Sequence, residues 1–92
     1  MKTEQLIRAN ATIIDVRTPM EFSAGHVAGS VNIPLNELQL RVEKIKEMQQ
    51  PFVLCCASGA RSAQATGYLK SQGIACENGG SWLDVNYLKS IV

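Results

Sequence analysis

The sequence predicts an α/β fold in which a mainly parallel sheet carries helices on both faces. Short β-branched or apolar runs alternate with segments of helical periodicity along the chain, and this alternation is typical of parallel strands joined by crossover helices. The 92 residues suffice for one small domain, residues 1–92, and are too few for two. Hydrophobic residues make up 46% of the chain, which provides a core and argues against intrinsic disorder.

The first part of the chain predicts a helix, a buried strand and a second helix. A short helix is expected over Glu4–Ala9 and a strand over Ala11–Val16, which is a compact β-branched run. Thr18 and Pro19 then supply an N-cap residue and a proline at the first helical position. The helix that they start is expected to end at Gly25, a residue that tolerates a left-handed turn.

The middle of the chain predicts a second strand and a longer helix. Ser30–Ile33 is expected to be the strand, which Pro34 stops. Asn36 is expected to cap the helix, which ends before Pro51. Its buried face consists of residues at helical spacing: Leu38, Val42, Ile45 and Met48.

The last part of the chain predicts a central strand followed by a helix. Phe52–Cys55 is a continuous apolar run, as expected for a strand covered on both faces. A helix is expected over Arg61–Gln72, with Gly73 at its end. After it we expect a short strand over Ile74–Cys76, a turn at Gly79-Gly80 and a terminal helix over Trp82–Ile91.

Charge and cysteine content exclude several classes of partner. The formal net charge is +1 and acidic and basic residues are mixed, so we expect neither a nucleic-acid nor a membrane partner. No apolar run approaches the roughly 20 residues that span a bilayer, and residues 1–10 carry Glu4 and Arg8, unlike a signal peptide. Three cysteines, two of them adjacent, make a poor disulfide framework. We therefore expect a cytoplasmic location.

A loop of small residues carries the predicted chemistry, between the strand at Phe52–Cys55 and the next helix. Ligands of parallel sheets bind beyond the carboxyl ends of strands. Small residues let successive amides turn inward as an anion nest, and the following helix N-terminus favours negative charge. With Arg61 nearby, these features are expected to lower the pKa of Cys56 and to bind an oxyanion such as a thiosulfonate. The candidate catalytic residue is Cys56, and the candidate anion-binding residues are Ala57, Ser58, Gly59, Ala60, Arg61 and Ser62.

Alternative roles for the cysteines are structural. Cys56 could be only a small apolar residue in a turn, and the catalytic interpretation fails if its side chain is packed in the interior or the amides of residues 56–62 turn away from it. Cys55 is expected to be buried and inert, and Cys76 to belong to the core. Metal binding by the two adjacent cysteines and His26 is not expected, because adjacent cysteines alternate sides of a strand and no spaced ligand pair exists.

Three groups of residues lie in a recognisable order along the chain. The loop reads CASGARS, a cysteine, four residues with glycine third, then arginine and serine. Upstream, residues 14–34 contain IDVR, EF, GHVAGS and NIP, and downstream Asn78-Gly79-Gly80 precedes Trp82. These motifs resemble those of the rhodanese sulfurtransferases, whose pattern is D-x-R, E-(aromatic), G-H-(I/V)-x-G-A, N-(I/V)-P, the cysteine loop, and a double glycine near a tryptophan.

The resemblance implies a rhodanese-like three-layer α/β/α fold with a central parallel sheet of four to five strands. Four are expected because the chain begins at the helix that follows the extra edge strand of many members. It also implies that Cys56 takes sulfur from a small-molecule donor such as thiosulfate and carries it as a persulfide. The acceptor would be a thiol or cyanide, or a sulfur-relay partner protein, and no cofactor or metal is required.

Asp15 and Arg17 are the candidate supporting residues. Asp15 ends a strand, so it is expected either to order the loop or Arg61, or to cap a nearby turn. Arg17 and Glu21, four residues apart, are expected to form a structural ion pair. His26 is expected to form a hydrogen bond in the turn at the helix end, against the hypothesis that it is the general base for Cys56.

Two competing functions stay open at this point. A cysteine phosphatase or arsenate reductase would use Cys55, which has five residues before Arg61. Against this reading, Leu54 stands where those phosphatases usually have histidine, and the glycine fits a loop that begins at Cys56 better. A persulfide carrier or docking module would share the chemistry of Cys56 without turnover of small molecules.

Overall fold

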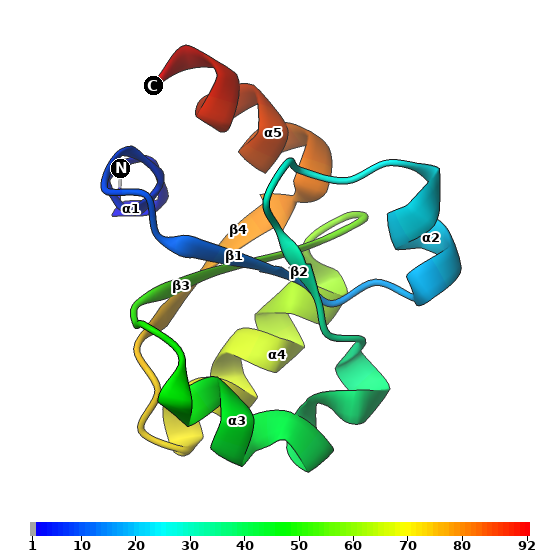
Figure 1. The fold of residues 1–92 in the computed structure, drawn as a ribbon, viewed down its shortest axis with the longest axis vertical. Coiled ribbons are helices and arrows are strands. Elements are labelled where there is room, and N and C mark those ends of the chain that lie inside the picture. The colour runs from blue at the N-terminus through cyan, green and yellow to red at the C-terminus, as the bar shows by residue number, and fades with distance from the viewer. Residues whose placement is uncertain (1) are drawn as a thin grey trace.

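The computed structural model describes residues 2–92 and shows a four-stranded parallel sheet between two helical layers (Figure 1). The strand order is β2-β1-β3-β4. The strands are β1 (Thr12–Asp15), β2 (Val31–Asn32), β3 (Phe52–Cys56) and β4 (Cys76–Ser81). The helices are α1 (Lys2–Arg8), α2 (Pro19–Ala24), the 3-10 helix η1 (Leu35–Arg41), α3 (Val42–Glu47), α4 (Ala60–Ser71) and α5 (Trp82–Ile91). The predicted three-layer α/β/α architecture with a parallel sheet is confirmed.

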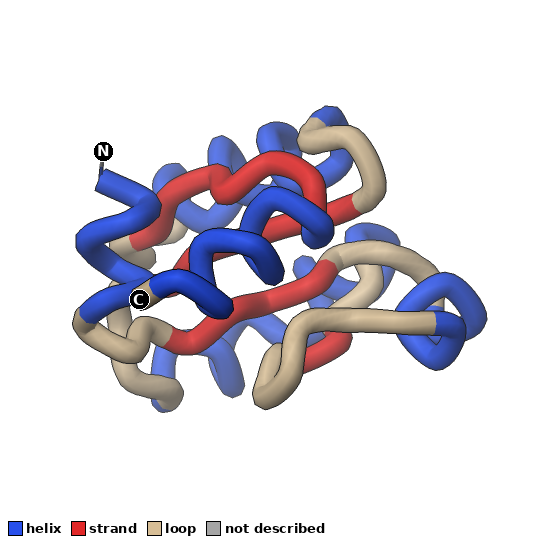
Figure 2. The backbone as a smooth tube through the Cα atoms, turned by 90° about the horizontal axis from the view of Figure 1, so that it is seen from above, coloured by secondary structure: helices blue, strands red, loops and turns tan. Residues whose placement is uncertain are grey.

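The side chains of β3 divide between two cores because successive residues of a strand point to opposite faces. Phe52, Leu54 and Cys56 pack into one core with residues of η1, α3 and α4, whereas Val53 and Cys55 pack into a second core with residues of α1 and α5. Figure 2 shows α1 and α5 lying over the strands on this second side. All five strand residues are buried, as predicted for Phe52–Cys55, whereas Cys56, which was expected to begin the loop, is the last residue of the strand.

The N-terminus of α2 forms as predicted. Thr18 is its N-cap, and its hydroxyl accepts a hydrogen bond from the Glu21 amide at 3.2 Å while the Glu21 carboxylate accepts one from the Thr18 amide at 2.9 Å. This reciprocal pair is a capping box, and Pro19 follows the cap. The helix ends at Gly25 as predicted, but Gly25, with φ 157° and ψ 136°, has a positive φ outside the left-handed helical conformation.

The prediction that Asn36 caps one long helix is wrong. The segment begins as the 3-10 helix η1 directly after Pro34, without a side-chain cap, and continues as the separate α3. A 3-10 helix has three residues per turn. Leu35 and Leu38 therefore share one side of η1, where Leu38 is buried and Leu35 packs against the same core.

The prediction of a turn at Gly79-Gly80 is also wrong, because both glycines belong to β4, which extends from Cys76 to Ser81. The register with β3 shifts there: Leu54 pairs with Asn78, and Cys55 pairs with Gly80. Gly79 is the extra residue of this irregularity, and a Cβ atom on it would lie 2.7 Å from side-chain carbons of both Val53 and Val85. Glycine is required here by close packing and not by a turn.

The helices of residues 2–92 are all too short or too polar to cross a membrane. The terminal helix α5 has the predicted bounds, Trp82–Ile91.

Candidate active site

The loop after β3 is shaped by a left-handed glycine at the start of α4. Gly59 is the N-cap residue, with φ 101° and ψ −12°. A Cβ atom at this position would lie 3.3 Å from the Cα atom of Gly80 on β4, so the loop also approaches the neighbouring strand closely. This conformation is accessible to glycine at little cost. It turns the Gly59 amide back toward the cysteine that precedes the loop.

Three potential hydrogen-bond donors at the end of the loop lie close to the Cys56 sulfur. The Gly59 amide lies 3.0 Å from Sγ, and the Ser62 amide and hydroxyl each lie 3.4 Å from it. The predicted convergence of amides on this sulfur is therefore confirmed for Gly59 and Ser62. Burial raises the pKa of the thiol, but hydrogen bonds from Ser62, Gly59 and the Ser58 amide outweigh it, so the net pKa of Cys56 is lowered below 9.0.

The Cys56 side chain lies in the packed interior, which is one of the two conditions under which the catalytic interpretation was expected to fail; the other condition, amides turned away from the sulfur, is not met. The residue is 0% exposed and belongs to the same core as Leu54 and Ala65. The next two residues of the loop, Ala57 and Ser58, are exposed and have small side chains.

Cys55 has the opposite environment from Cys56. Its side chain lies in the core on the α1 and α5 side of the sheet and is fully buried. Burial raises the pKa of this thiol to about 12. Cys55 is buried and protonated as predicted, and it points away from the face that holds Cys56. A phosphatase loop with Cys55 as its nucleophile is therefore not formed.

Arg61, at the start of α4, is paired with Glu21 of α2. Its two terminal nitrogens lie 2.8 and 3.0 Å from the two carboxylate oxygens, with about a third of each side chain exposed. The hydrogen bonds from Arg61, and then from the Thr18 amide, lower the pKa of Glu21 to about 2. The predicted Arg17–Glu21 ion pair is wrong, and the positive charge of Arg61 is balanced by a fixed carboxylate.

Asp15 orders Arg17 rather than Arg61 or the loop. The Arg17 amide and side chain donate to the Asp15 carboxylate, with the shortest contact 2.7 Å, and both side chains are buried. The guanidinium also donates to the Gly25 carbonyl at 2.7 Å and lies 4.7 Å from the ring centre of Trp82. This buried pair joins β1 to α2 and α5 and is structural.

His26 and Cys76 have structural positions as well. The His26 Nδ1 atom lies 2.7 Å from the Phe22 carbonyl oxygen, and the two rings stack with centroids 3.7 Å apart. The predicted role in the turn is confirmed. Cys76 is buried, its sulfur lies 3.7 Å from the Thr66 carbonyl oxygen, and burial raises its pKa.

Sequence reasoning missed two residues that hold the loop, Glu21 and Asn78. Glu21 has a visible signal as the third helical residue of a capping box, but that signal does not reveal its pairing with Arg61 on another element. Asn78 accepts the Ser62 hydroxyl at 2.7 Å and donates to the Gly59 carbonyl at 3.2 Å. Nothing in the local sequence distinguishes it from a turn residue before two glycines.

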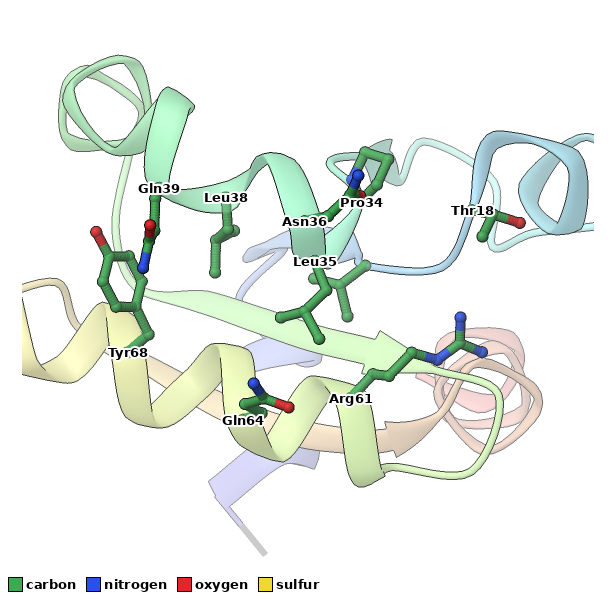
Figure 3. Close-up of a pocket in the computed structure, with 10 residues that line it drawn as sticks. Thr18, Pro34, Leu35, Asn36, Leu38, Gln39, Arg61, Gln64 and Tyr68 are labelled. Atoms are coloured by element: carbon green, nitrogen blue, oxygen red, sulfur yellow. The ribbon is translucent and has the colours of Figure 1, made fainter.

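A groove of about 550 Å³ lies between η1 and α4, beside the end of the loop at Arg61 (Figure 3). Its walls are mostly apolar or carry uncharged amides and hydroxyls, and Arg61 is the one charged residue on it. The residues that line it are Val16, Thr18, Pro34, Leu35, Asn36, Leu38, Gln39, Arg61, Gln64 and Tyr68.

Comparisons with known proteins find relatives over most of the chain. The chain is 40% identical over 74 residues to the uncharacterized protein YqhL of Bacillus subtilis, covering 77% of this chain and 58% of YqhL. It is 34% identical over 74 residues to the thiosulfate sulfurtransferase PspE of Escherichia coli, covering 78% of this chain and 71% of PspE. A solved structure described as a rhodanese with anions from E. coli superposes with a TM-score of 0.73 at 33% identity, covering 80% of this chain and 89% of that chain.

The match to a family model is broader than any of these. The model described as the rhodanese-like domain matches residues 2–85, which include every element from α1 to the first turn of α5. The chain spans little more than half the length of YqhL. By the extent of this match and the identity to PspE, the chain belongs to the rhodanese-like domain family.

Proposed function

We propose that the protein is a sulfurtransferase that moves sulfane sulfur from a donor such as thiosulfate to a thiol acceptor through a persulfide on Cys56. The observation that carries the proposal is the convergence of three potential donors on the Cys56 sulfur: the Gly59 amide, the Ser62 amide and the Ser62 hydroxyl. Donors in this arrangement stabilise an anion at the sulfur, and a thiolate is the nucleophilic form of cysteine. The sulfurtransferase relatives support the same chemistry.

The reaction divides into two displacements at sulfur. The Cys56 thiolate attacks the outer sulfur of thiosulfate, a new S–S bond forms, and the old S–S bond breaks as sulfite leaves with its electron pair. An acceptor thiolate or cyanide then attacks the outer sulfur of the persulfide, and Cys56 leaves as the thiolate. Each step consumes one nucleophile and releases one, so no external oxidant or reductant is needed. This scheme is covalent catalysis with ping-pong kinetics.

We propose that the thiol that accepts the sulfur binds in the groove beside the loop and reaches Cys56 from there. The groove adjoins the loop through Arg61, whose charge Glu21 balances, and its other walls are uncharged. An uncharged, extended thiol fits this lining better than a multiply charged one. Gln64→Arg adds a long charged side chain to the exposed α4 wall, and we expect it to raise the KM for the acceptor while sulfur loading from thiosulfate stays unchanged. Equal effects on both half-reactions would contradict this placement.

The test of the proposed function is sulfur loading followed by mass spectrometry of the intact protein. Thiosulfate treatment is expected to add one sulfur atom to the wild type and to Cys55→Ala, and none to Cys56→Ser. Cys55→Ala is the matched control because both cysteines are fully buried neighbours on β3. A sulfur adduct that survives Cys56→Ser would overturn the assignment.

A second candidate function is a persulfide carrier or docking module that works with a partner protein. The burial of Cys56 beneath its loop favours this version, because a partner that displaces the loop would give access to the sulfur. Turnover with cyanide, small monothiols and dithiols separates the two. Loading without turnover on any of these small acceptors would favour the carrier, and multiple turnovers would favour the free-standing enzyme.

A further inference from the structure

The Ser62 hydroxyl has a single hydrogen and three acceptors within reach. Its oxygen lies 2.7 Å from the Asn78 Oδ1 atom, 3.2 Å from the Gly59 carbonyl oxygen and 3.4 Å from the Cys56 sulfur. A hydroxyl donates one hydrogen bond at a time. Because the contact with Asn78 is the shortest, the Ser62 hydroxyl donates its hydrogen bond to Asn78 in this structure.

The orientation of the Asn78 amide is determined by its other partners. Its Nδ2 atom donates to the Gly59 carbonyl at 3.2 Å, and its Oδ1 atom accepts from the Gly80 amide at 3.0 Å. Exchanging the amide nitrogen and oxygen would place two donors against each other at Gly80 and two acceptors against each other at Gly59. The Oδ1 atom therefore faces Ser62, and Ser62 must be the donor in that bond. Asn78 occupies this position directly before the extra residue of β4, Gly79.

We propose that Asn78 is a positioning residue that competes with Cys56 for the hydroxyl hydrogen of Ser62. While Cys56 is a thiol, its own S–H can donate to the Ser62 oxygen, and Asn78 keeps the hydroxyl hydrogen. When the thiol loses its proton to solvent, the hydroxyl rotates and donates to the anionic sulfur instead, because hydrogen bonds to charged acceptors are stronger. We expect the same exchange when Cys56 carries a persulfide anion. That expectation rests on the proposed sulfurtransferase function, whereas the exchange at the thiol does not.

Replacing Asn78 with another uncharged residue removes none of the charged groups near the Cys56 sulfur. Arg61 on α4 acts on Cys56 through its charge and is paired with Glu21 of α2. Behind the sheet, Asp15 and Arg17 form the buried pair beside Cys55. Asn78→Leu keeps the number and branching of the side-chain heavy atoms and removes both the acceptor and the donor without a change of charge, so a change in thiol ionisation would come from hydrogen bonding.

The test is the pH dependence of Cys56 alkylation by iodoacetamide, read by mass spectrometry of the Cys56 peptide. Without Asn78, the Ser62 hydroxyl can donate to the Cys56 sulfur or to the Gly59 carbonyl, and the charge of the thiolate favours the sulfur. Asn78→Leu is therefore expected to move the alkylation midpoint to lower pH and to speed alkylation below the midpoint roughly two- to tenfold, the equivalent of one hydrogen bond. Ser62→Ala is expected to move the midpoint to higher pH.

The double variant decides between competition and simple loop support. In the Ser62→Ala background, Asn78→Leu is expected to cause no further shift of the midpoint. A shift that persists without Ser62, or a rise of the midpoint in Asn78→Leu alone, would overturn the proposal. Asn78→Ala serves as a second replacement if the leucine variant does not fold. Alkylation needs no sulfur donor, so its outcome stands apart from the sulfur-loading test of the proposed function.

Discussion

Cys55 and Cys56 are adjacent in the sequence and equally buried, yet their surroundings give them opposite chemistry. Each is 0% exposed. Cys55 packs among aliphatic side chains of one core, and burial raises its pKa to about 12. Cys56 is also penalised by burial, but hydrogen bonds from the loop lower its pKa overall. Burial alone therefore does not distinguish an inert cysteine from a nucleophilic one; the number of donors aimed at the sulfur does.

The comparison extends to the charges on either side of β3. Asp15 and Arg17, beside Cys55, form a pair in which both side chains are almost fully buried. Glu21 and Arg61, beside Cys56, form a pair in which each side chain is about a third exposed. The first arrangement supports the fold, because breaking a buried pair strands a charge. The second arrangement positions the loop but contributes little to the free energy of unfolding, because exposed ion pairs are weak.

The largest expected difference is in thiol reactivity. The pKa of Cys55 is about 12 and that of Cys56 is below 9.0, so near neutral pH the thiolate fraction of Cys55 is smaller by roughly a thousandfold or more. Native-state alkylation is expected to label Cys56 well before Cys55, and denaturation should remove the preference. The measurement is peptide mass spectrometry over time, and comparable labelling of both residues in the folded protein would break the comparison.

Removing the buried carboxylate is expected to have the next largest effect. Asp15→Asn leaves Arg17 buried without its counter-charge and is expected to lower the free energy of unfolding by about 3–5 kcal/mol. Urea denaturation followed by circular dichroism measures the change. A loss no larger than that of Glu21→Gln, the matched variant in the exposed pair, would contradict the contrast between the two sides.

Gly79 tests how closely β4 packs on the Cys55 side. Gly79→Ala would place a methyl group 2.7 Å from carbons of Val53 and Val85, and such overpacking is expected to destabilise the protein by about 1–3 kcal/mol. Gly67→Ala on α4 is the matched control, because nothing lies within 4 Å of its added carbon, and it is expected to stabilise by about 0.5–1 kcal/mol. Urea denaturation measures the free energy of unfolding of both variants. Equal changes in the two variants would show that β4 shifts to accommodate the methyl group at Gly79.

The smallest expected effect comes from Glu21 and appears in the pH dependence of stability. Its pKa in the folded protein is about 2, below the ordinary 4.5. Its stabilising contribution is therefore fully present above pH 4.5 and is lost as the pH falls through about 2. The difference in unfolding free energy between wild type and Glu21→Gln should be constant above pH 4.5 and should shrink toward pH 2. A difference that grows on acidification would contradict the pairing with Arg61.

The sequence predicted features that depend on neighbours along the chain and missed those that depend on distant pairing. The Thr18 cap, the buried strand at Phe52 and the amides turned toward Cys56 follow from local spacing, since a loop before a helix exposes free N–H groups. The Arg61–Glu21 pair joins residues 40 positions apart. The strand at Gly79 resembles a turn in sequence because close packing and turns both select glycine.

The complete burial of the Cys56 side chain could not be predicted from the local sequence either. A residue directly before a loop usually marks the edge of the core, and the surface exposed above Cys56 depends on how the loop lies on β4. Gly59 of the loop closely approaches Gly80 of β4, a residue 21 positions further along the chain, and this approach cannot be seen in the sequence of the loop alone.

The loop is held at several independent points, by Arg61 to α2, by Asn78 to β4 and by its own helix. Its backbone therefore loses most of its conformational entropy when the chain folds, and little remains to be lost when an anion arrives. The amides need not be gathered around each new charge on the sulfur. For the proposed reaction we expect a kinetic consequence: uncovering the Cys56 sulfur, rather than arranging the amides around it, limits how fast the sulfur compound reaches it.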